Sequence, residues 1–252
     1  MNNFAMNIQY DGTNYSGWQN QPNSITVQKR IEEALFKIFN QKINIVGSGR
    51  TDSGVHAFGQ VANFRIDFYM KLSIHQLKKA LNHYLPNDIK INNIVEVDEE
   101  FHSRFSAQFR EYKYYLSQIE NVFNRKYEYY CKYPLEIDKL FESAQIFQIK
   151  ADFTTFSKKN PDLINPICNV TLCQWQQVAP LRYELTIKSN HFLYGMVRSL
   201  VGAMIDVARN RLTINQVEEF LTLKDRSNNS TLAEAKGLFL NKIYYGENYP
   251  QI

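Results

Sequence analysis

The order of predicted helices and strands repeats along the 252 residues of the chain. Apolar residues that alternate with polar ones predict strands, and apolar residues three or four positions apart predict helices. In the first half these patterns predict, in order, a strand at 4–10, a helix at 27–38, strands at 42–46 and 60–67, a helix after Ser73, and a strand at 89–97. The order is therefore strand, helix, two strands, helix and strand.

The second half repeats this order. Its patterns predict a strand at 107–117, a helix at 137–147, strands at 168–178 and 181–188, a long apolar helix at 197–208, a short helix after Thr213, and a closing strand at 237–245. Thr213 and Gln216 have the spacing of a capping box, in which each side chain satisfies a backbone N–H of the other residue. The repetition indicates two related halves.

Two successive units of this kind predict an α+β fold with two ferredoxin-like βαββαβ halves, which form a mostly antiparallel sheet flanked by helices. Three acids, Asp98, Glu99 and Glu100, interrupt the apolar pattern near the middle of the chain. We therefore expect a first subdomain at 1–105 and a second at 106–252. This architecture hosts many unrelated activities, so function has to be argued from particular residues.

Composition sets few limits on function. Charged residues make up 21% of the chain and the net charge is +4, which permits an RNA partner without requiring one. Three cysteines cannot all pair within one chain and fit a reducing compartment, so we expect a cytoplasmic protein. No apolar run reaches the roughly 20 residues that cross a bilayer, and the first residues lack the pattern of a signal peptide.

The most informative segment is the glycine-rich loop at 47–60, between the second and third predicted strands. Four glycines in this stretch permit a tight bend, and Arg50 and Asp52 stand two residues apart within it. The loop lacks the lysine followed by Ser or Thr that a phosphate-binding P-loop carries after its last glycine. On these residues alone, Asp52 is as readily explained by a side-chain turn with its own backbone, and Arg50 by a surface charge.

Taken in full, the stretch from Gly49 to Ala57, followed by Gly59, Gln60 and Val61, resembles the catalytic loop of the TruA family of tRNA pseudouridine synthases. Further blocks match in the family's order along nearly the whole chain. They lie at residues 10–19, 26–28, 101–114, 152–156, 190–202 and 235–240.

This resemblance implies an isomerase that converts uridine to pseudouridine in the tRNA anticodon stem-loop, at positions 38, 39 and 40. The reaction breaks the bond between the base and the ribose and rejoins the ribose to C5 of the uracil, so nothing is oxidised and no group is imported. The resemblance therefore implies no cofactor and no metal. The expected partner is tRNA, and a homodimer is expected because family members work as homodimers.

Four residues receive roles from the resemblance. Asp52 is the catalytic carboxylate, a nucleophile or an electrostatic stabiliser beside the sugar or base. Arg198 is the expected ion-pair partner of that carboxylate, Tyr112 the ring that stacks on the flipped uracil, and Arg50 the residue that helps to extrude the uridine. Because Asp52 falls in the first half and Tyr112 and Arg198 in the second, we expect an active-site cleft between the halves.

Other interpretations stay open at these positions. Tyr112 and Tyr114 share one face of their strand, so spacing alone does not choose between them, and either ring could simply fill the sheet face. Arg198 could be an exposed helix arginine. For Asp52, attack on C1′ of the ribose, attack on C6 of the pyrimidine and proton abstraction to a glycal are all compatible with the sequence.

The chain departs from the family pattern after Pro166, where it reads Ile167-Cys168-Asn169 in place of the usual arginine. A thiol cannot supply a charge-assisted RNA contact, so the same chemistry on another RNA stays an alternative. A non-catalytic RNA-binding module is a second alternative, which the retention of Asp52, Tyr112 and Arg198 together disfavours.

Overall fold

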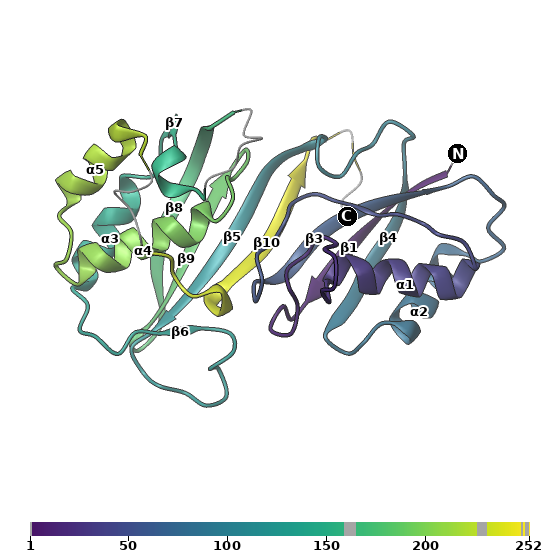
Figure 1. The fold of residues 1–252 in the computed structure, drawn as a ribbon, viewed down its shortest axis with the longest axis horizontal. Coiled ribbons are helices and arrows are strands. Elements are labelled where there is room, and N and C mark those ends of the chain that lie inside the picture. Colours follow the sequence, from purple (N-terminus) through teal and green to yellow (C-terminus); the bar gives the residue numbers. More distant parts are fainter. Residues whose placement is uncertain (1, 159–164, 226–230, 248, 250–251) are drawn as a thin grey trace. The chain divides into compact units, whose positions relative to one another are not determined.

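Figure 1 shows the fold in the computed structural model, which describes residues 2–158, 165–225, 231–247, 249 and 252. The chain forms two compact units. The first comprises Met1–Gln108 together with Phe239–Ile252, and the second comprises Phe109–Leu238. The expected subdomains at 1–105 and 106–252 stay a prediction.

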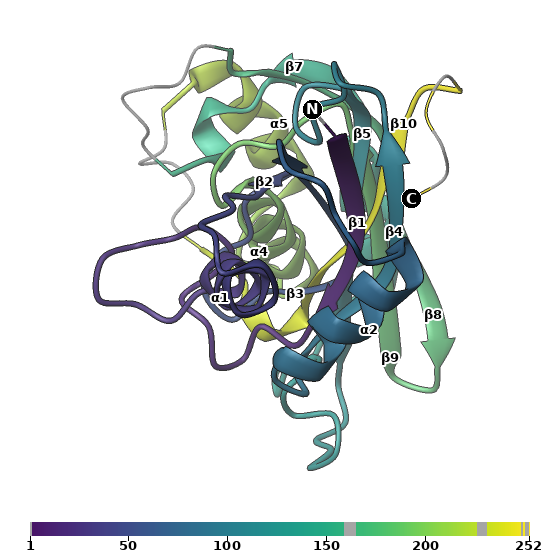
Figure 2. The same cartoon turned by 90° about the vertical axis from the view of Figure 1, so that its right-hand side faces the viewer.

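The first unit has the predicted order of elements. It contains β1 (Asn2–Tyr10), α1 (Val27–Phe39), β2 (Val46–Gly47), β3 (His56–Ile66), α2 (Ile74–Tyr84), β4 (Ile89–Val97) and β10 (Leu238–Tyr245). The first residue of β10 belongs to the second unit. Strand β1 is antiparallel to both β3 and β4, whereas β10 is parallel to β3. The turned view in Figure 2 shows α1 and α2 beside these strands.

Both helices of this unit begin at capped residues. The Thr26 side chain accepts a hydrogen bond from the Lys29 N–H, and Ser73 forms a capping box with Gln76. Helix α1 buries the residues of its apolar stripe, Val27, Ile31, Ala34 and Leu35. Each of the buried Val, Ile and Leu side chains contributes about 1.5–3 kcal/mol to folding.

One strand is much shorter than predicted. The pattern at 42–46 predicts a full strand, but β2 consists of Val46–Gly47 alone, paired with β3. Side chains of α1 form hydrogen bonds with the backbone of Ile45 instead. Its N–H donates to Glu32 Oε1 at 3.0 Å, and its carbonyl accepts from Gln28 Nε2 at 3.2 Å. Ile43 and Ile45 are buried, which explains the alternating pattern without a sheet ladder.

The second unit follows the order predicted for the second half except for the closing strand at 237–245, which is β10 and lies, after its first residue, in the first unit. It contains β5 (Ala107–Ser117), β6 (Tyr129–Tyr130), α3 (Ile137–Gln145), β7 (Lys150–Asp152), β8 (Ile167–Ala179), β9 (Arg182–Ser189), α4 (Met196–Ala208) and α5 (Ile214–Leu223). The first two residues of β5 belong to the first unit. Strands β5, β9, β8 and β7 are neighbours in that order, and each neighbouring pair is antiparallel. The capping box of Thr213 and Gln216 is present at the start of α5.

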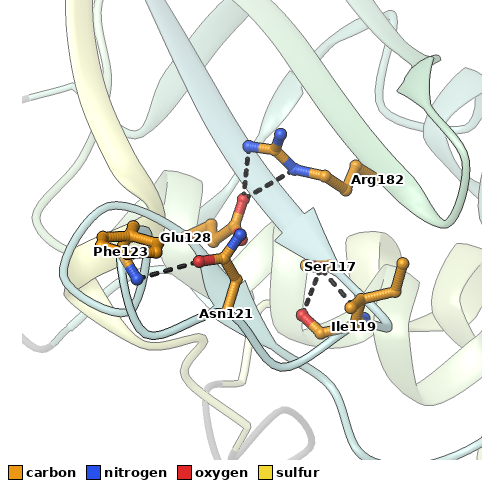
Figure 3. A network of polar contacts seen from close by, with 6 residues as sticks. All are labelled: Ser117, Ile119, Asn121, Phe123, Glu128 and Arg182. Carbon is orange, nitrogen blue, oxygen red and sulfur yellow. Dashed lines mark hydrogen bonds and ion pairs between the residues drawn. The ribbon is translucent and has the colours of Figure 1, made fainter.

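The sequence patterns did not predict two short strands, because a strand of two or three residues is too short to show a periodicity. These are β6, which runs parallel to β5, and β7, which pairs with β8. The segment before β6 is held by a buried carboxylate: Glu128 accepts two hydrogen bonds from the Arg182 guanidinium, as Figure 3 shows.

The predicted α+β class with a mostly antiparallel sheet flanked by helices is confirmed in both units. In the described part of the chain, no helix is both long and apolar enough to cross a membrane.

Candidate active site

Asp52 and Arg50 lie on the loop that joins β2 to β3 in the first unit. Asp52 is half-buried and Arg50 is exposed. The Asp52 carbonyl accepts a hydrogen bond from the Val55 N–H at 3.1 Å, which closes a four-residue turn. Gly54, at the third position of this turn, has a φ of +75°. Residues with a side chain rarely adopt this φ, so the turn that presents Asp52 depends on a glycine there.

Thr51, the residue directly before Asp52, is tied to the N-terminal strand and the segment after it. The Tyr10 hydroxyl lies 2.8 Å from Thr51 Oγ1 in a buried contact. The Thr51 carbonyl accepts a hydrogen bond from the Trp18 N–H at 3.1 Å. Tyr10 and Trp18 are buried, with their rings 6.0 Å apart. Residues 10–18 therefore form a packed support for the loop.

Gly17 of this support lies close to the loop and has a φ of +92°. A Cβ atom at this position would lie 2.5 Å from the Thr51 carbonyl oxygen, closer than any side chain permits. The carbonyl of nearby Tyr15 accepts from Ser53 Oγ at 3.1 Å and from the Gly54 N–H at 3.3 Å. The backbones of the two segments come this close because each has a glycine at the contact, Gly17 in one and Gly54 in the other.

Gln60 of β3 supports the beginning of the loop. Its Nε2 donates to the Gly49 carbonyl at 2.8 Å, while its Oε1 accepts from Ser48 Oγ at 2.7 Å and from the Val61 N–H at 3.2 Å. Gln60 and Ser48 are buried, so these bonds satisfy polar groups that water does not reach.

His56, the first residue of β3, anchors the other end. Its Nδ1 lies 3.0 Å from the Gly12 nitrogen and 3.1 Å from Asp11 Oδ1. Its ring stacks on Phe239 of β10 with centroids 4.6 Å apart. The loop is thus held at both ends and at its middle, which fixes the position of the Asp52 backbone.

Tyr112 lies on β5 in the second unit, paired with Ile187 of β9. Its buried ring meets Phe192 edge-on, with centroids 5.2 Å apart. Tyr114, two residues further on, is fully buried and donates from its hydroxyl to the Glu234 carbonyl at 3.0 Å. Burial raises the pKa of Tyr114 well above its usual value. Tyr114 is therefore engaged in the fold, which leaves Tyr112 as the better candidate for contact with a substrate.

Arg198 lies in α4. All the other residues of this helix are buried, whereas Arg198 is half-buried. Its Nε donates to the Ala233 carbonyl at 2.7 Å, and the Ala233 N–H donates to the Arg198 carbonyl at 3.0 Å. The first bond holds the guanidinium beside the turn that precedes β10, and the second ties the backbone of α4 to that turn. A guanidinium held in this way is pre-organised for a bidentate contact with a carboxylate or phosphate.

The structure thus brings Arg50 and Asp52 together on one loop of the first unit, and it sets Tyr112 and Arg198 in the second. The expected cleft and the pairing of Asp52 with Arg198 stay predictions. The sequence patterns did not assign roles to the supporting residues, Tyr10, Gly17 and Thr51. Their signal was the matched block at 10–19, which could not be connected to the loop at 47–60 before the fold was known.

Among the described residues, no group of three or more His, Cys, Asp or Glu side chains is placed to hold a metal ion. Cys168 and Cys173 are buried free thiols. Burial raises the pKa of both, that of Cys168 to about 12, so neither is a reactive thiolate near neutral pH. Cys168 does not take the place of a charged RNA contact.

A family model described as tRNA pseudouridine synthase matches residues 6–106 and 144–246. Three proteins named tRNA pseudouridine synthase A are similar over nearly their whole length. The protein of Bacteroides fragilis is 35% identical, covering 94% of each chain. That of Azobacteroides pseudotrichonymphae is 38% identical, covering 97% of each chain. That of Thermodesulfovibrio yellowstonii is 39% identical, covering 97% of this chain and all of the relative.

The matched segments include the loop of Asp52 and the helix of Arg198, two of the features on which the resemblance in the sequence rested. Identities of 35–39% across nearly complete chains leave that resemblance confirmed, and the protein belongs to the tRNA pseudouridine synthase family, a family of isomerases.

Proposed function

We propose that the protein isomerises uridine to pseudouridine in the anticodon stem-loop of tRNA, at positions 38, 39 and 40. The names of its relatives support tRNA as the substrate. The observation that carries the proposal is the anchored loop of the first unit. A half-buried carboxylate, Asp52, starts from a backbone that is tied through Thr51 to Tyr10 and Trp18.

Asp52 is the catalytic carboxylate in this proposal. A nucleophile or electrostatic stabiliser gains most when it is held close to its reacting position, because positioning is achieved before the substrate arrives. The hydrogen bonds at Thr51, Ser53 and Gly54 do this for the backbone on both sides of Asp52. Such anchoring is unnecessary for a residue that only turns the chain.

The other three residues act on the same nucleotide. Arg198 stabilises the charge on the Asp52 carboxylate, and Tyr112 stacks its ring on the uracil. Arg50, whose side chain is exposed, assists extrusion of the uridine from the RNA stem. Extrusion costs a few kcal/mol, which a cation beside the RNA backbone offsets in part.

The reaction proceeds without a cofactor, since its bonds are broken and made within one nucleotide. The enzyme works on tRNA in the cytoplasm, and it works as a homodimer.

Release of tritium from C5-labelled uridine tests the proposal, because joining C5 to the ribose displaces the hydrogen at C5. The substrate is a transcribed tRNA with uridine at positions 38–40, and the enzyme is freed of small molecules by gel filtration with a chelator. We expect release with this enzyme, and pseudouridine in the product at the three positions. No release from any tRNA would refute the proposed activity, whereas release at other positions or from another RNA would refute the site in the anticodon stem-loop.

A further inference from the structure

A hollow of about 420 Å³ lies on the first unit at the end of β3 that is remote from Asp52. It is lined by β2 and the segment before it, by the end of β3 and by one residue of the turn after β4; its charged and polar lining residues include Lys42, Asn63, Arg65, Asp67 and His102. Strand β3 rises about 3.3 Å per residue from His56, so Asn63 and Arg65 lie roughly 20–30 Å along it. The hollow is therefore separate from the loop of Asp52.

Hydrogen bonds hold the walls of this hollow in place. The Ser103 N–H donates to Asn63 Oδ1 at 3.0 Å, and Ser103 Oγ donates to the Val46 carbonyl. Tyr245 of β10 donates from its hydroxyl to the Ser103 carbonyl at 2.8 Å. The turn that carries His102 is thus fastened to β2, β3 and β10. A ligand would find the hollow already formed, which lowers the entropy cost of binding.

Two of the side chains that line the hollow are cations, Lys42 and Arg65, and one is an acid, Asp67. The turn adds Arg104 after His102 and three exposed acids before it, Asp98, Glu99 and Glu100, and Arg65 Nη2 donates to the Glu99 carbonyl. Burial lowers the pKa of His102, and the positive charges of Arg104 and Arg65 lower it further. The two cations that line the hollow itself favour an anion such as a phosphate.

The neutral His102 ring offers a donor as well. Its Nδ1 accepts from the backbone N–H groups of Arg104 and Phe105 at 3.2 and 3.3 Å. The proton of the neutral ring therefore sits on Nε2. Together with Lys42 and Arg65, this gives the hollow donors of three kinds for phosphate oxygens.

An exposed aromatic ring lies beside these donors. Phe105 has 76% of its surface exposed, its ring centroid is 4.4 Å from that of His102, and the Arg104 guanidinium carbon is 5.6 Å from its ring centre. A single exposed aromatic residue is ordinary. An exposed ring beside a cation is an arrangement that proteins use to stack an unpaired base next to its phosphate.

We infer that Lys42, Arg65, His102 and Phe105 form a second RNA-binding site, the Phe105 site, which takes a phosphate in the hollow and an unpaired base on the Phe105 ring. That the ligand is RNA rests on the proposed function. The Phe105 site is too far from Asp52 along β3 to hold the target uridine. It binds nucleotides elsewhere in the same RNA and contributes affinity rather than chemistry.

Binding of a fluorescently labelled tRNA transcript, measured against salt concentration, tests this inference. The variants are Phe105→Ala and the double variant Lys42→Gln with Arg65→Gln. The control is Lys79→Gln, which removes an exposed cation of α2 away from the hollow. We expect Phe105→Ala to raise Kd about tenfold, as loss of one base stack does. The double variant should raise Kd and reduce the salt slope by about 1–2, because each lost phosphate contact reduces it by about 1.

Tritium release by the wild type, measured on the same preparation, separates this inference from the proposed function. If the wild type releases tritium and both variants bind tRNA with its Kd and salt slope, the Phe105 site is refuted and the proposed function stands. If the wild type binds tRNA but releases no tritium, while the variants bind more weakly than Lys79→Gln, the proposed activity is refuted and the Phe105 site stands. Phe105→Ala keeps the test decisive if the double variant fails to fold, because an exposed side chain contributes little to folding.

Discussion

The hydroxyl of Tyr10 lies 2.8 Å from Oγ1 of Thr51, in a buried contact one residue before the carboxylate that we propose as catalytic. This bond joins the first strand of the chain to a loop some 40 residues later. It connects two sequence blocks that matched the family separately, and it explains why a conformationally demanding loop needs the residues at 10–18.

Tyr10→Phe tests that bond because it keeps the ring and removes only the hydroxyl. The Thr51 hydroxyl is then left buried without this partner, which costs about 1–2 kcal/mol of unfolding free energy. A loop that shifts Asp52 by a fraction of an ångström lowers single-turnover tritium release by about 10- to 100-fold. We expect Kd for tRNA to stay within about a factor of two to three of the wild-type value. Wild-type turnover in a variant with the expected loss of stability would show that the bond serves the fold alone.

Gly17→Ala places a Cβ against the Thr51 carbonyl at a φ of +92°. Since neither strain can be relieved without moving the loop, we expect a loss of about 1–3 kcal/mol in denaturant unfolding together with a loss of turnover. Gly246→Ala is the matched control, because there the new Cβ meets the end of the flexible Gln108 side chain. Equal stability of the two variants would contradict the close approach at Gly17.

Glu128→Gln tests the buried contact in Figure 3, where Arg182 donates from Nε at 3.0 Å and from Nη2 at 2.8 Å. Removing the charge weakens both bonds, so we expect about 1–3 kcal/mol of destabilisation and faster proteolysis at 119–127. Glu136→Gln is the control, since its ion pair with Lys139 is exposed to water and contributes little to stability. Unchanged proteolysis in Glu128→Gln would mean that the contact does not hold this segment.

The three cysteines should resist modification in the folded protein. All three are buried, and burial raises the pKa of Cys168 to about 12. Below that pH its thiol form dominates, and only the thiolate reacts. We expect less than one equivalent of label from a thiol reagent at pH 8 and three equivalents in guanidinium. Rapid labelling of the native protein at Cys168 would contradict this burial.

Sequence patterns predicted long elements well and short ones poorly. Ile89–Val97 and Ala107–Ser117 have the predicted bounds, since each carries several residues of regular alternation. The strand at 42–46 was overextended because Ile43 and Ile45 alternate while α1 side chains hold the Ile45 backbone.

The candidate site was likewise only partly predicted by the sequence. The motif around Asp52 identified the loop, but its support by Tyr10 and Gly17 depends on contacts between distant segments. No spacing rule along one chain encodes such contacts. The choice between Tyr112 and Tyr114 likewise became a physical one only when the Tyr114 hydroxyl was found on the Glu234 carbonyl.

The variant Asp52→Asn tests whether the Asp52 carboxylate carries the chemistry. This variant keeps the size of the side chain and removes its charge, and Ser53→Ala in the same turn is the control. Single-turnover tritium release from C5-labelled tRNA is measured at saturating enzyme, with tRNA affinity determined in parallel. We expect Asp52→Asn to bind tRNA but to release no tritium above background, whereas Ser53→Ala stays within about tenfold of the wild-type rate, since it loses one hydrogen bond. Tritium release by Asp52→Asn at the wild-type rate would contradict this role of the carboxylate.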